Sequence, residues 1–253
     1  MVQAGSCLCL GIFYCMRIFL LGHRGFIGGS LLSRLESFGH VVIHDMKYLD
    51  DKYDCVINMA AVTHIKNEFD PKLIESNIIL MNDVFKKTEK IIYASSCSAA
   101  HFTNPYAWSK MWAEHLGAKH GNALGLRFHN VFGPGNNKGI VWWLTQQPDG
   151  AEITIRGASV IRDYIYVDCV VDEIISHLGG LRYTGVLDVG TGVGTKTIDV
   201  VKLYMKLSGK IFVIDGVPHN STEPMEMVSN NVVSHISLEQ GLLKMINDVS
   251  NKK

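Results

Sequence analysis

The sequence shows no excess of either charge, because 24 lysines and arginines balance 24 aspartates and glutamates in a chain of 253 residues. Without a net positive field, the protein is not expected to bind nucleic acid or an anionic membrane surface. Hydrophobic residues make up 47% of the chain, yet no uninterrupted apolar run reaches the ~20 residues that a membrane-spanning helix needs. Any affinity for a phosphate-bearing ligand must therefore come from a local site.

Patterns typical of metal sites are also missing. The six cysteines show no ligand spacing with histidines, so we expect no bound metal. In a large α/β chain, cysteines inside predicted strands and loops favour reduced thiols and a cytoplasmic location. Residues 1–15 are apolar and cysteine-rich but lack the basic region and cleavage site of a signal peptide. We interpret residues 1–15 as a start-codon extension or an unstructured segment without a role in the fold.

A glycine-rich turn stands where a first strand passes into a first helix. Residues 17–21 are β-prone, and apolar residues recur at helical spacing from residue 26. Between them, Gly22 would allow the tight turn, Gly25 a close approach of the backbone to a ligand, and Gly28 close packing of helix on strand. Free N–H groups at the start of such a helix can bind a pyrophosphate. A glycine-rich turn of any α/β domain would have the same pattern.

The connection after the second expected strand is unusually short. Strands are expected at 41–44 and 55–58, with only about ten residues between them. A parallel crossover normally needs a dozen or more residues and contains a helix. We therefore expect a crossover without a helix and a narrow sheet. Asp45 follows the second strand, where a dinucleotide-binding fold holds the adenosine ribose and repels a 2′-phosphate, which favours NAD over NADP. An aspartate in a solvent-exposed turn fits the same position.

Strand and helix patterns alternate along the rest of the chain, as in a parallel α/β sheet. The break at residues 131–135 contains glycine and proline and marks the boundary to a smaller lobe. Helices are expected at 71–88, 105–120 and 198–207 and after residues 162–168, and strands at 91–94, 123–128, 153–156 and 186–189.

The predicted fold class is α/β, with a Rossmann-type doubly wound parallel sheet and a small C-terminal substrate lobe. The NAD-binding domain is expected to comprise residues 16–132, with 163–192 returning to it. The substrate-binding lobe is expected to comprise residues 133–162 and 193–253.

Three polar residues could move a proton. Tyr106 and Lys110 lie one turn apart on the helix expected at 105–120, and Ser96 ends the preceding strand. The pKa of free tyrosine, about 10, is too high for a base at neutral pH, but a neighbouring ammonium and a cationic nicotinamide ring would lower it. Tyr106 could then remove the proton of an alcohol that Ser96 holds. A Tyr-x-x-x-Lys pair alone is typical of a solvated helix face, but its place after a Ser-Ser strand end favours catalysis.

These motifs resemble those of the extended short-chain dehydrogenase/reductases, and among them the NAD-dependent epimerase/dehydratase family that acts on nucleotide sugars. The resemblance extends from Arg17 to about Leu207. The motifs that agree in order are Gly22-x-x-Gly25-x-x-Gly28, Asn58-Met-Ala-Ala61, Ser95-Ser96, Pro105-Tyr106-x-x-x-Lys110, Arg127-x-x-Asn130-Val-Phe-Gly-Pro, Arg162-Asp-Tyr-Ile-Tyr-Val-Asp168 and Asp188-Val-Gly-Thr-Gly192.

The resemblance implies roles for further residues. Phe26, Ile27 and Asp45 would contact NAD, and Ala60, Ala61 and Asn77 would line its nicotinamide side. Asn130 and Arg162 would contact the diphosphate of a nucleotide-sugar substrate. A guanidinium fork suits a diphosphate, although Arg162 could instead pair with Asp163 or Asp168. The family also implies a homodimer formed through the helices expected at 71–88 and 105–120.

The dehydratases of this family need an Asp-Glu pair directly after the catalytic hydroxyl residue, whereas Cys97 and Ser98 follow Ser96 here. The first hypothesis is therefore a nucleotide-sugar epimerase similar to the UDP-glucose 4-epimerases, which oxidises sugar C4 with bound NAD and returns the hydride to the other face. An alternative resembles the GDP-4-keto-6-deoxymannose epimerase/reductases (GDP-fucose synthases), in which Cys97 would act as an acid/base. A third is an inactive NAD-binding homologue, because the loops are shortened.

Overall fold

The computed structural model describes residues 14–63, 70–179, 184–217 and 224–251. Its central feature is a six-stranded sheet with the order β2-β1-β3-β4-β5-β9, in which all pairings are parallel. From β1 the chain moves one way to β2 and then the other way to β3, β4 and β5, so the expected doubly wound Rossmann-type sheet is confirmed. The strands are β1 (Arg17–Leu21), β2 (Val41–Ile43), β3 (Cys55–Asn58), β4 (Ile91–Ser96), β5 (Ala123–Phe128) and β9 (Gly185–Val189).

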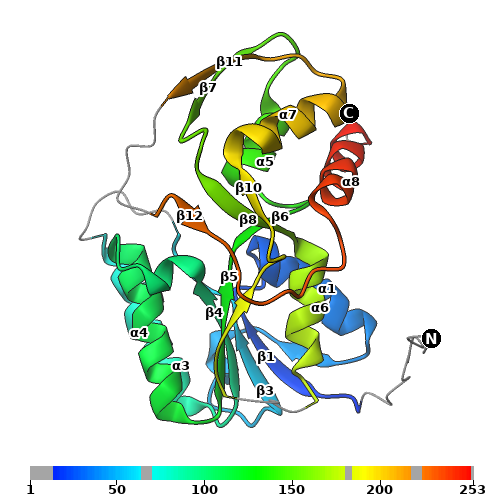
Figure 1. Cartoon of the computed structure of the whole chain (residues 1–253). Coiled ribbons are helices and arrows are strands. Elements are labelled where there is room, and N and C mark those ends of the chain that lie inside the picture. Colours follow the sequence, from blue (N-terminus) through cyan, green and yellow to red (C-terminus); the bar gives the residue numbers. More distant parts are fainter. Residues whose placement is uncertain (1–13, 64–69, 180–183, 218–223, 252–253) are drawn as a thin grey trace, which may run out of the picture.

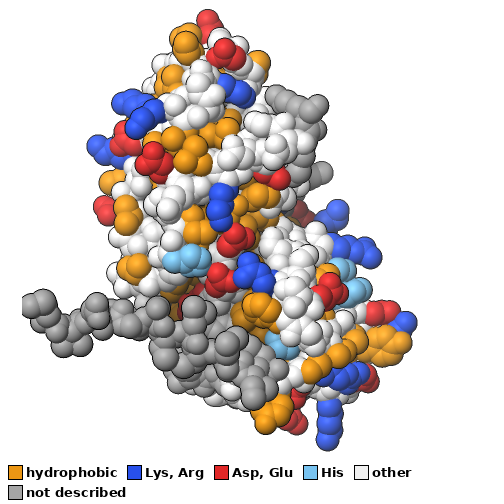
Figure 2. All heavy atoms as spheres, turned by 90° about the vertical axis from the view of Figure 1, so that its right-hand side faces the viewer, with side chains coloured by type: hydrophobic (Ala, Val, Ile, Leu, Met, Phe, Trp, Pro, Cys, Tyr) orange, Lys and Arg blue, Asp and Glu red, His pale blue; other side chains and the backbone are white. Residues whose placement is uncertain are grey.

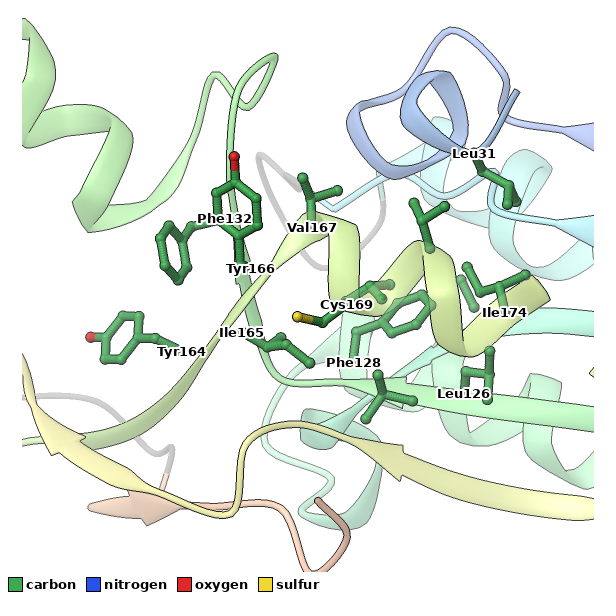
Figure 3. Close-up of a cluster of buried hydrophobic side chains, with 14 of the residues drawn as sticks. Leu31, Leu126, Phe128, Phe132, Tyr164, Ile165, Tyr166, Val167, Cys169 and Ile174 are labelled. Atoms are coloured by element: carbon green, nitrogen blue, oxygen red, sulfur yellow. The ribbon is translucent and has the colours of Figure 1, made fainter. Parts of the chain in front are cut away.

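Helices cover both faces of this sheet (Figure 1). On one face lie α1 (Phe26–Ser37) and α6 (Val167–Ser176), and on the other lie α3 (Leu80–Lys87) and α4 (Pro105–His120). Side chains of β1 alternate between two apolar cores, as the geometry of a strand requires: Ile18 and Leu20 belong to one core and Phe19 and Leu21 to the other. Figure 3 shows the first core between α1, α6 and β5.

The crossover from β2 to β3 has the form expected from its length. It contains only the short 3₁₀ turn η1 (Met46–Tyr48) in place of an α-helix. Arg17, at the start of β1, holds this segment: its guanidinium donates to Asp51 and to the carbonyl of Lys52, both at 2.7 Å, and its backbone N–H donates to Asp54 at 2.7 Å. These contacts keep the segment across the end of β1 and thereby allow β3 to pair on its other side.

The helix expected at 71–88 is present but not uniform. It consists of α2 (Pro71–Leu73), the π-helical segment η2 (Ile74–Ile79) and α3. Asp70 caps its start by accepting a hydrogen bond from the backbone N–H of Lys72 at 3.0 Å. Periodicity predicted the helix, but it could not reveal the wider turn.

A second group of elements lies beyond the carboxyl ends of the sheet (Figure 1). Here β8 (Ile161–Tyr166) pairs with β6 (Asn130–Phe132), β10 (Gly194–Lys196) and β12 (Glu226–Met227), while β7 (Glu152–Arg156) pairs with β11 (Val213–Val217). The short turn η3 (Cys97–Ala100) follows β4. The helices of the second group are α5 (Gly139–Gln146), α7 (Thr197–Ser208) and α8 (Leu238–Ser250). The sequence did not predict α5, α8, β6, β8, β10, β11 or β12. The expected domain division stays a prediction: β8 belongs to this second group, although α6, which follows it directly, covers the first sheet.

The composition also led to expectations about the surface and the thiols. In the described part of the chain, no helix combines the length and the hydropathy that crossing a membrane would require. Charges of both signs are interspersed on the face shown in Figure 2. Cys15, Cys55, Cys97 and Cys169 are free, and burial raises the pKa of the Cys55 thiol to about 12. The cytoplasmic location stays a prediction, and residues 1–13 of the expected extension lie outside the described residues.

Two neighbouring glycines of α1 provide a test of the packing of helix on turn. A Cβ at Gly28 would overlap the carbonyl oxygen of Gly22, whereas a Cβ at Gly29 would lie 3.4 Å from the carbonyl oxygen of His23, an ordinary contact. We expect Gly28→Ala to lower the free energy of unfolding by about 1–3 kcal/mol through overpacking. Gly29→Ala, the matched control, should leave it unchanged or raise it by up to about 1 kcal/mol, since alanine favours a helix. Urea denaturation measures both, and equal effects would contradict the close approach.

Candidate active site

A cleft of about 790 Å³ opens at the carboxyl ends of the strands, below the second group of elements. The glycine turn after β1 and the ends of β4 and β5 line one side of it, and residues of β6, β7 and β8 line the other. The turn after β1 lies beside the point where the strand order reverses. Open α/β sheets bind their ligands at such a switch point.

The glycine turn has the geometry of an anion site. Gly22 adopts a φ of +81°, and a Cβ there would lie 2.5 Å from the backbone nitrogen of Ala60, so only glycine fits. The N–H of Gly25 donates to the carbonyl of Gly22 at 2.9 Å and closes the turn. Among the described residues, no side chain caps the start of α1, and its first turn has no acidic residue. Its N–H groups therefore remain able to bind a phosphate.

The structure brings Ser96, Tyr106 and Lys110 together in the cleft. The phenol of Tyr106, in the first turn of α4, lies beside the hydroxyl of Ser96, the last residue of β4, which interacts with it and stabilises the phenolate. Asn104 caps α4 by accepting from the N–H of Ala107 at 2.9 Å, which fixes this end of the helix. Lys110 is 2% exposed, and its Nζ lies 5.8 Å from the centre of the Tyr106 ring.

The electrostatics of this group differ from the expectation. Burial raises the pKa of Tyr106 to about 12, a shift that the neighbouring Ser96 hydroxyl only partly offsets. The lowered pKa expected for Tyr106 is therefore not produced by the chain alone. The Lys110 ammonium itself donates to the carbonyl of Ala94 at 2.8 Å. Burial also lowers the pKa of Lys110 to about 8. Both groups thus favour their neutral forms more strongly than they would in water.

The residues expected around the coenzyme occupy three different positions. Gly25, Phe26, Ile27, Gly28 and Ala61 line the cleft, as the roles assigned to them require. The backbones of Gly22 and Ala60 approach each other closely and do not line the cleft themselves.

Two other expected coenzyme residues lie outside the lining. Asn77 is buried and exchanges hydrogen bonds with the backbone of Val62 at 2.8 and 3.0 Å, and it also donates to Ser109, so it holds the segment after β3. Asp45 is exposed and pairs with Lys47 at 2.9 Å. It also accepts from the Lys47 N–H, and these bonds hold the pKa of the Asp45 carboxyl below its usual value. In this structure Asp45 therefore has the contacts of an aspartate in a solvent-exposed turn, the alternative given for it above.

The residues expected at the substrate face the same cleft. Asn130 and Arg162 both line it, and Arg162 is 8% exposed. Its guanidinium donates to the carbonyl of Ile161 at 2.9 Å. The two aspartates considered as its partners have other contacts. Asp163 accepts hydrogen bonds from Thr191, Gly192 and Ser229, and Asp168 lies 3.4 Å from Lys244.

Sequence reasoning missed other basic residues of the cleft. Arg24, Lys138 and Arg156 line it together with Lys110 and Arg162, and no aspartate or glutamate is among the described lining residues. The Lys138 ammonium donates to Thr63 at 2.9 Å and thus links the segment before α5 to the segment after β3. A count of charges over the whole chain cannot reveal such a local excess. Only Arg24 carried a sequence signal for a place in the cleft, because it lies inside the glycine turn.

Comparisons with known proteins agree with this arrangement. The profile of the NAD-dependent epimerase/dehydratase family matches residues 44–178. A trifunctional UDP-glucose 4,6-dehydratase/UDP-4-keto-6-deoxy-D-glucose 3,5-epimerase/UDP-4-keto-L-rhamnose-reductase of Arabidopsis thaliana is 26% identical over 197 residues, covering 64% of this chain and 29% of that protein. A dTDP-D-glucose 4,6-dehydratase of Dictyostelium discoideum is 28% identical over 200 residues, covering 62% and 46%. The chain thus spans less than half the length of either relative.

Solved structures show the same fold. The UDP-glucose 4-epimerase of Thermotoga maritima with UDP-glucose superimposes with a TM-score of 0.79 at 22% identity, covering 94% of this chain and 99% of that one. A variant of the UDP-glucuronic acid 4-epimerase of Bacillus cereus, in complex with a fluorinated UDP-glucuronic acid and NAD, gives 0.77 at 18% identity, covering 94% and 100%.

The glycine turn, with its open helix start, and the apolar residues beside it fit a dinucleotide. The family profile covers more than half of the chain. The protein therefore belongs to the NAD-dependent epimerase/dehydratase family, and its coenzyme is NAD.

Proposed function

We propose that the protein is an NAD-dependent nucleotide-sugar epimerase that oxidises and re-reduces the sugar at C4. The observation that carries this proposal is that Ser96, Tyr106 and Lys110 line the same cleft as the glycine turn, Asn130 and Arg162. Residues that suit a coenzyme and residues that suit a nucleotide diphosphate line this cleft together with the group proposed to transfer the proton.

The charge of the cleft supports a substrate with several phosphates. Five basic side chains and no carboxylate line it within the described residues, although the chain as a whole is neutral. A coenzyme and a nucleotide sugar each carry a diphosphate, so the two ligands together need a local excess of positive charge. Arg162, buried and planar, suits bidentate contact with phosphate oxygens.

In the proposed reaction, Ser96 and Tyr106 hold the C4 hydroxyl of the sugar. The C4 hydroxyl loses its proton to the Tyr106 oxygen and C4 loses a hydride, which leaves a 4-ketone; the reverse transfers on the other face give the epimer. When bound, NAD supplies the hydride acceptor and donor. The task of Lys110 is to favour the Tyr106 phenolate by its positive charge. Because burial disfavours that phenolate, the positive charge of the oxidised nicotinamide ring is needed as well.

The alternatives receive less support from the cleft. Elimination of water by a dehydratase needs carboxylates as acid and base, and the described lining contains none. Cys97, which would act in an epimerase/reductase of the GDP-fucose synthase type, is buried and does not line the cleft. An inactive homologue would have no need to retain the contact between Tyr106 and Ser96.

The proposal is tested by mass identification of the ligands that remain bound on purification, followed by incubation with UDP-glucose or UDP-galactose without added coenzyme. We expect bound NAD and interconversion of the two sugars. Consumption of NADPH with a GDP-4-keto-6-deoxy sugar would support the epimerase/reductase instead. Retained NAD without turnover of any nucleotide sugar would identify an inactive homologue.

Substitution of the proposed base gives a sharper prediction. Tyr106→Phe should lower kcat by on the order of 10²–10⁴-fold, because the proton acceptor is lost, while bound NAD is retained. Tyr204→Phe is the matched control, since Tyr204 is also buried but lies on α7 outside the cleft lining; its kcat should match that of the wild type. Equal activity of the two variants would rule out Tyr106 as the base.

We also propose that two copies pair through the outer faces of η2 and α4. Ile79 of η2 and Trp108 of α4 are 53% and 61% exposed, and they stand on two elements that pack against each other, so a partner could cover both. A double variant, Ile79→Glu with Trp108→Glu, should convert a dimer to a monomer in analytical ultracentrifugation. Ile211→Glu, at a similarly exposed residue before β11, should leave the dimer intact. A monomeric wild type at micromolar concentration would contradict the proposal.

A further inference from the structure

A carboxylate that two strands hold in place, that of Glu114, lies one turn along α4 from Lys110. Lys110 and Glu114 lie one turn apart on α4 and contact consecutive residues of β4. The ammonium of Lys110 donates to the carbonyl of Ala94, and the carboxylate of Glu114 accepts from the hydroxyl of Ser95 at 2.6 Å. The helix therefore meets the strand through one cationic and one anionic contact in adjacent positions.

Glu114 is held from a second strand as well. Arg127 of β5 donates to both of its carboxylate oxygens, from Nε at 2.8 Å and from Nη2 at 2.7 Å. The side chain of Glu114 is 11% exposed and that of Arg127 is 28% exposed. A bidentate pair of this kind fixes the orientation of the carboxylate. Glu114 thus holds its carboxylate in a fixed place one turn along α4 from Lys110.

Lys110 needs such a charge because it is 2% exposed. Burial lowers the pKa of Lys110, and the charge of Glu114 opposes that effect. The other titratable groups around the cluster are Tyr106 on α4, Tyr93 on β4 and Cys97 on η3, together with Arg127 on β5. Asp188 on β9 faces Arg127. Glu114 alone among the described residues raises the pKa of Lys110 in this environment.

We propose that Glu114, held by Arg127 and Ser95 one turn along α4 from Lys110, is a positioning residue that acts on the reaction through Lys110. Its part in catalysis rests on the proposed function, in which the Lys110 ammonium favours the Tyr106 phenolate. Its effect on Lys110 is a property of the fold and can be measured without turnover.

The first measurement is the titration of Lys110 in the NAD-loaded full-length protein labelled with ¹³C at lysine Cε. Lys110→Arg identifies the signal by removing it. In the wild type the midpoint should lie below the usual lysine value, as burial requires, and Glu114→Gln should move it to still lower pH, since the compensating charge is gone.

Arg127→Gln separates an electrostatic role from a structural one. This substitution breaks the same ion pair but leaves the charge of Glu114 unneutralised, so the Lys110 midpoint should move to higher pH. If Glu114 only braced the fold, both variants would shift the midpoint in the same direction. The matched control is Asp172→Asn, which breaks the 2.7 Å ion pair of α6 with Arg34 and should leave the midpoint unchanged. Arg127→Gln also keeps the test decisive if Glu114→Gln does not fold.

The pH profile of kcat gives the second measurement. The Lys110 ammonium is present below its pKa and lost above it, so kcat should fall as the pH rises through that value. Compared with the wild type, this fall should occur at lower pH in Glu114→Gln and at higher pH in Arg127→Gln. Glu114→Asp, which retains the charge, should restore most of the wild-type profile. An unchanged Lys110 midpoint in both variants would overturn the inference. Shifted midpoints in a protein that turns over no nucleotide sugar would instead overturn the proposed function and leave the influence of Glu114 on Lys110 standing.

Discussion

The packing of α4 against the end of β4 is the interaction on which the site depends. It brings Tyr106 to Ser96, directs Lys110 to the carbonyl of Ala94, and carries the ion pair of Glu114 with Arg127. Glycines make this packing close, since a Cβ at Gly117 of α4 or at Gly125 of β5 would collide with the ring of Tyr93. The same strand end lies on the side of the cleft that the glycine turn also lines. The proposed catalytic group and the anion site are therefore consequences of a single arrangement of helix and sheet.

Much of the fold could be predicted because its signals are local. The glycine turn and the short crossover follow from spacing, and the structure adds the contacts of Arg17 that hold the crossover in place. The second group of elements was harder, since strands such as β6 and β12 are too short to show a period. The helix α8 did carry a readable signal: Ser237 and Gln240 form a capping box at its start.

The candidate site was predictable in its residue types but not in its electrostatics. Motifs placed Ser96, Tyr106 and Lys110 together, but the raised pKa of Tyr106 comes from burial, which spacing does not show. Asp45 occupies the expected strand end, yet Lys47, two residues later, pairs with its side chain. Arg156 and Lys138 reach the cleft from elements that only the tertiary structure brings together. A neutral chain thus forms a basic cleft, and its overall composition gives no sign of it.

The most direct test of the account follows the hydrogen bound to sugar C4. In the proposed reaction Tyr106 takes only the proton of the C4 hydroxyl, while the hydrogen on the carbon leaves and returns as a hydride. UDP-galactose carrying deuterium at C4 is incubated in ordinary water with the enzyme and its retained coenzyme, and the product is examined by NMR and mass spectrometry. The account predicts that the deuterium stays at C4 of the UDP-glucose that forms. Exchange of that deuterium with water would contradict it, because the hydrogen would then have left as a proton.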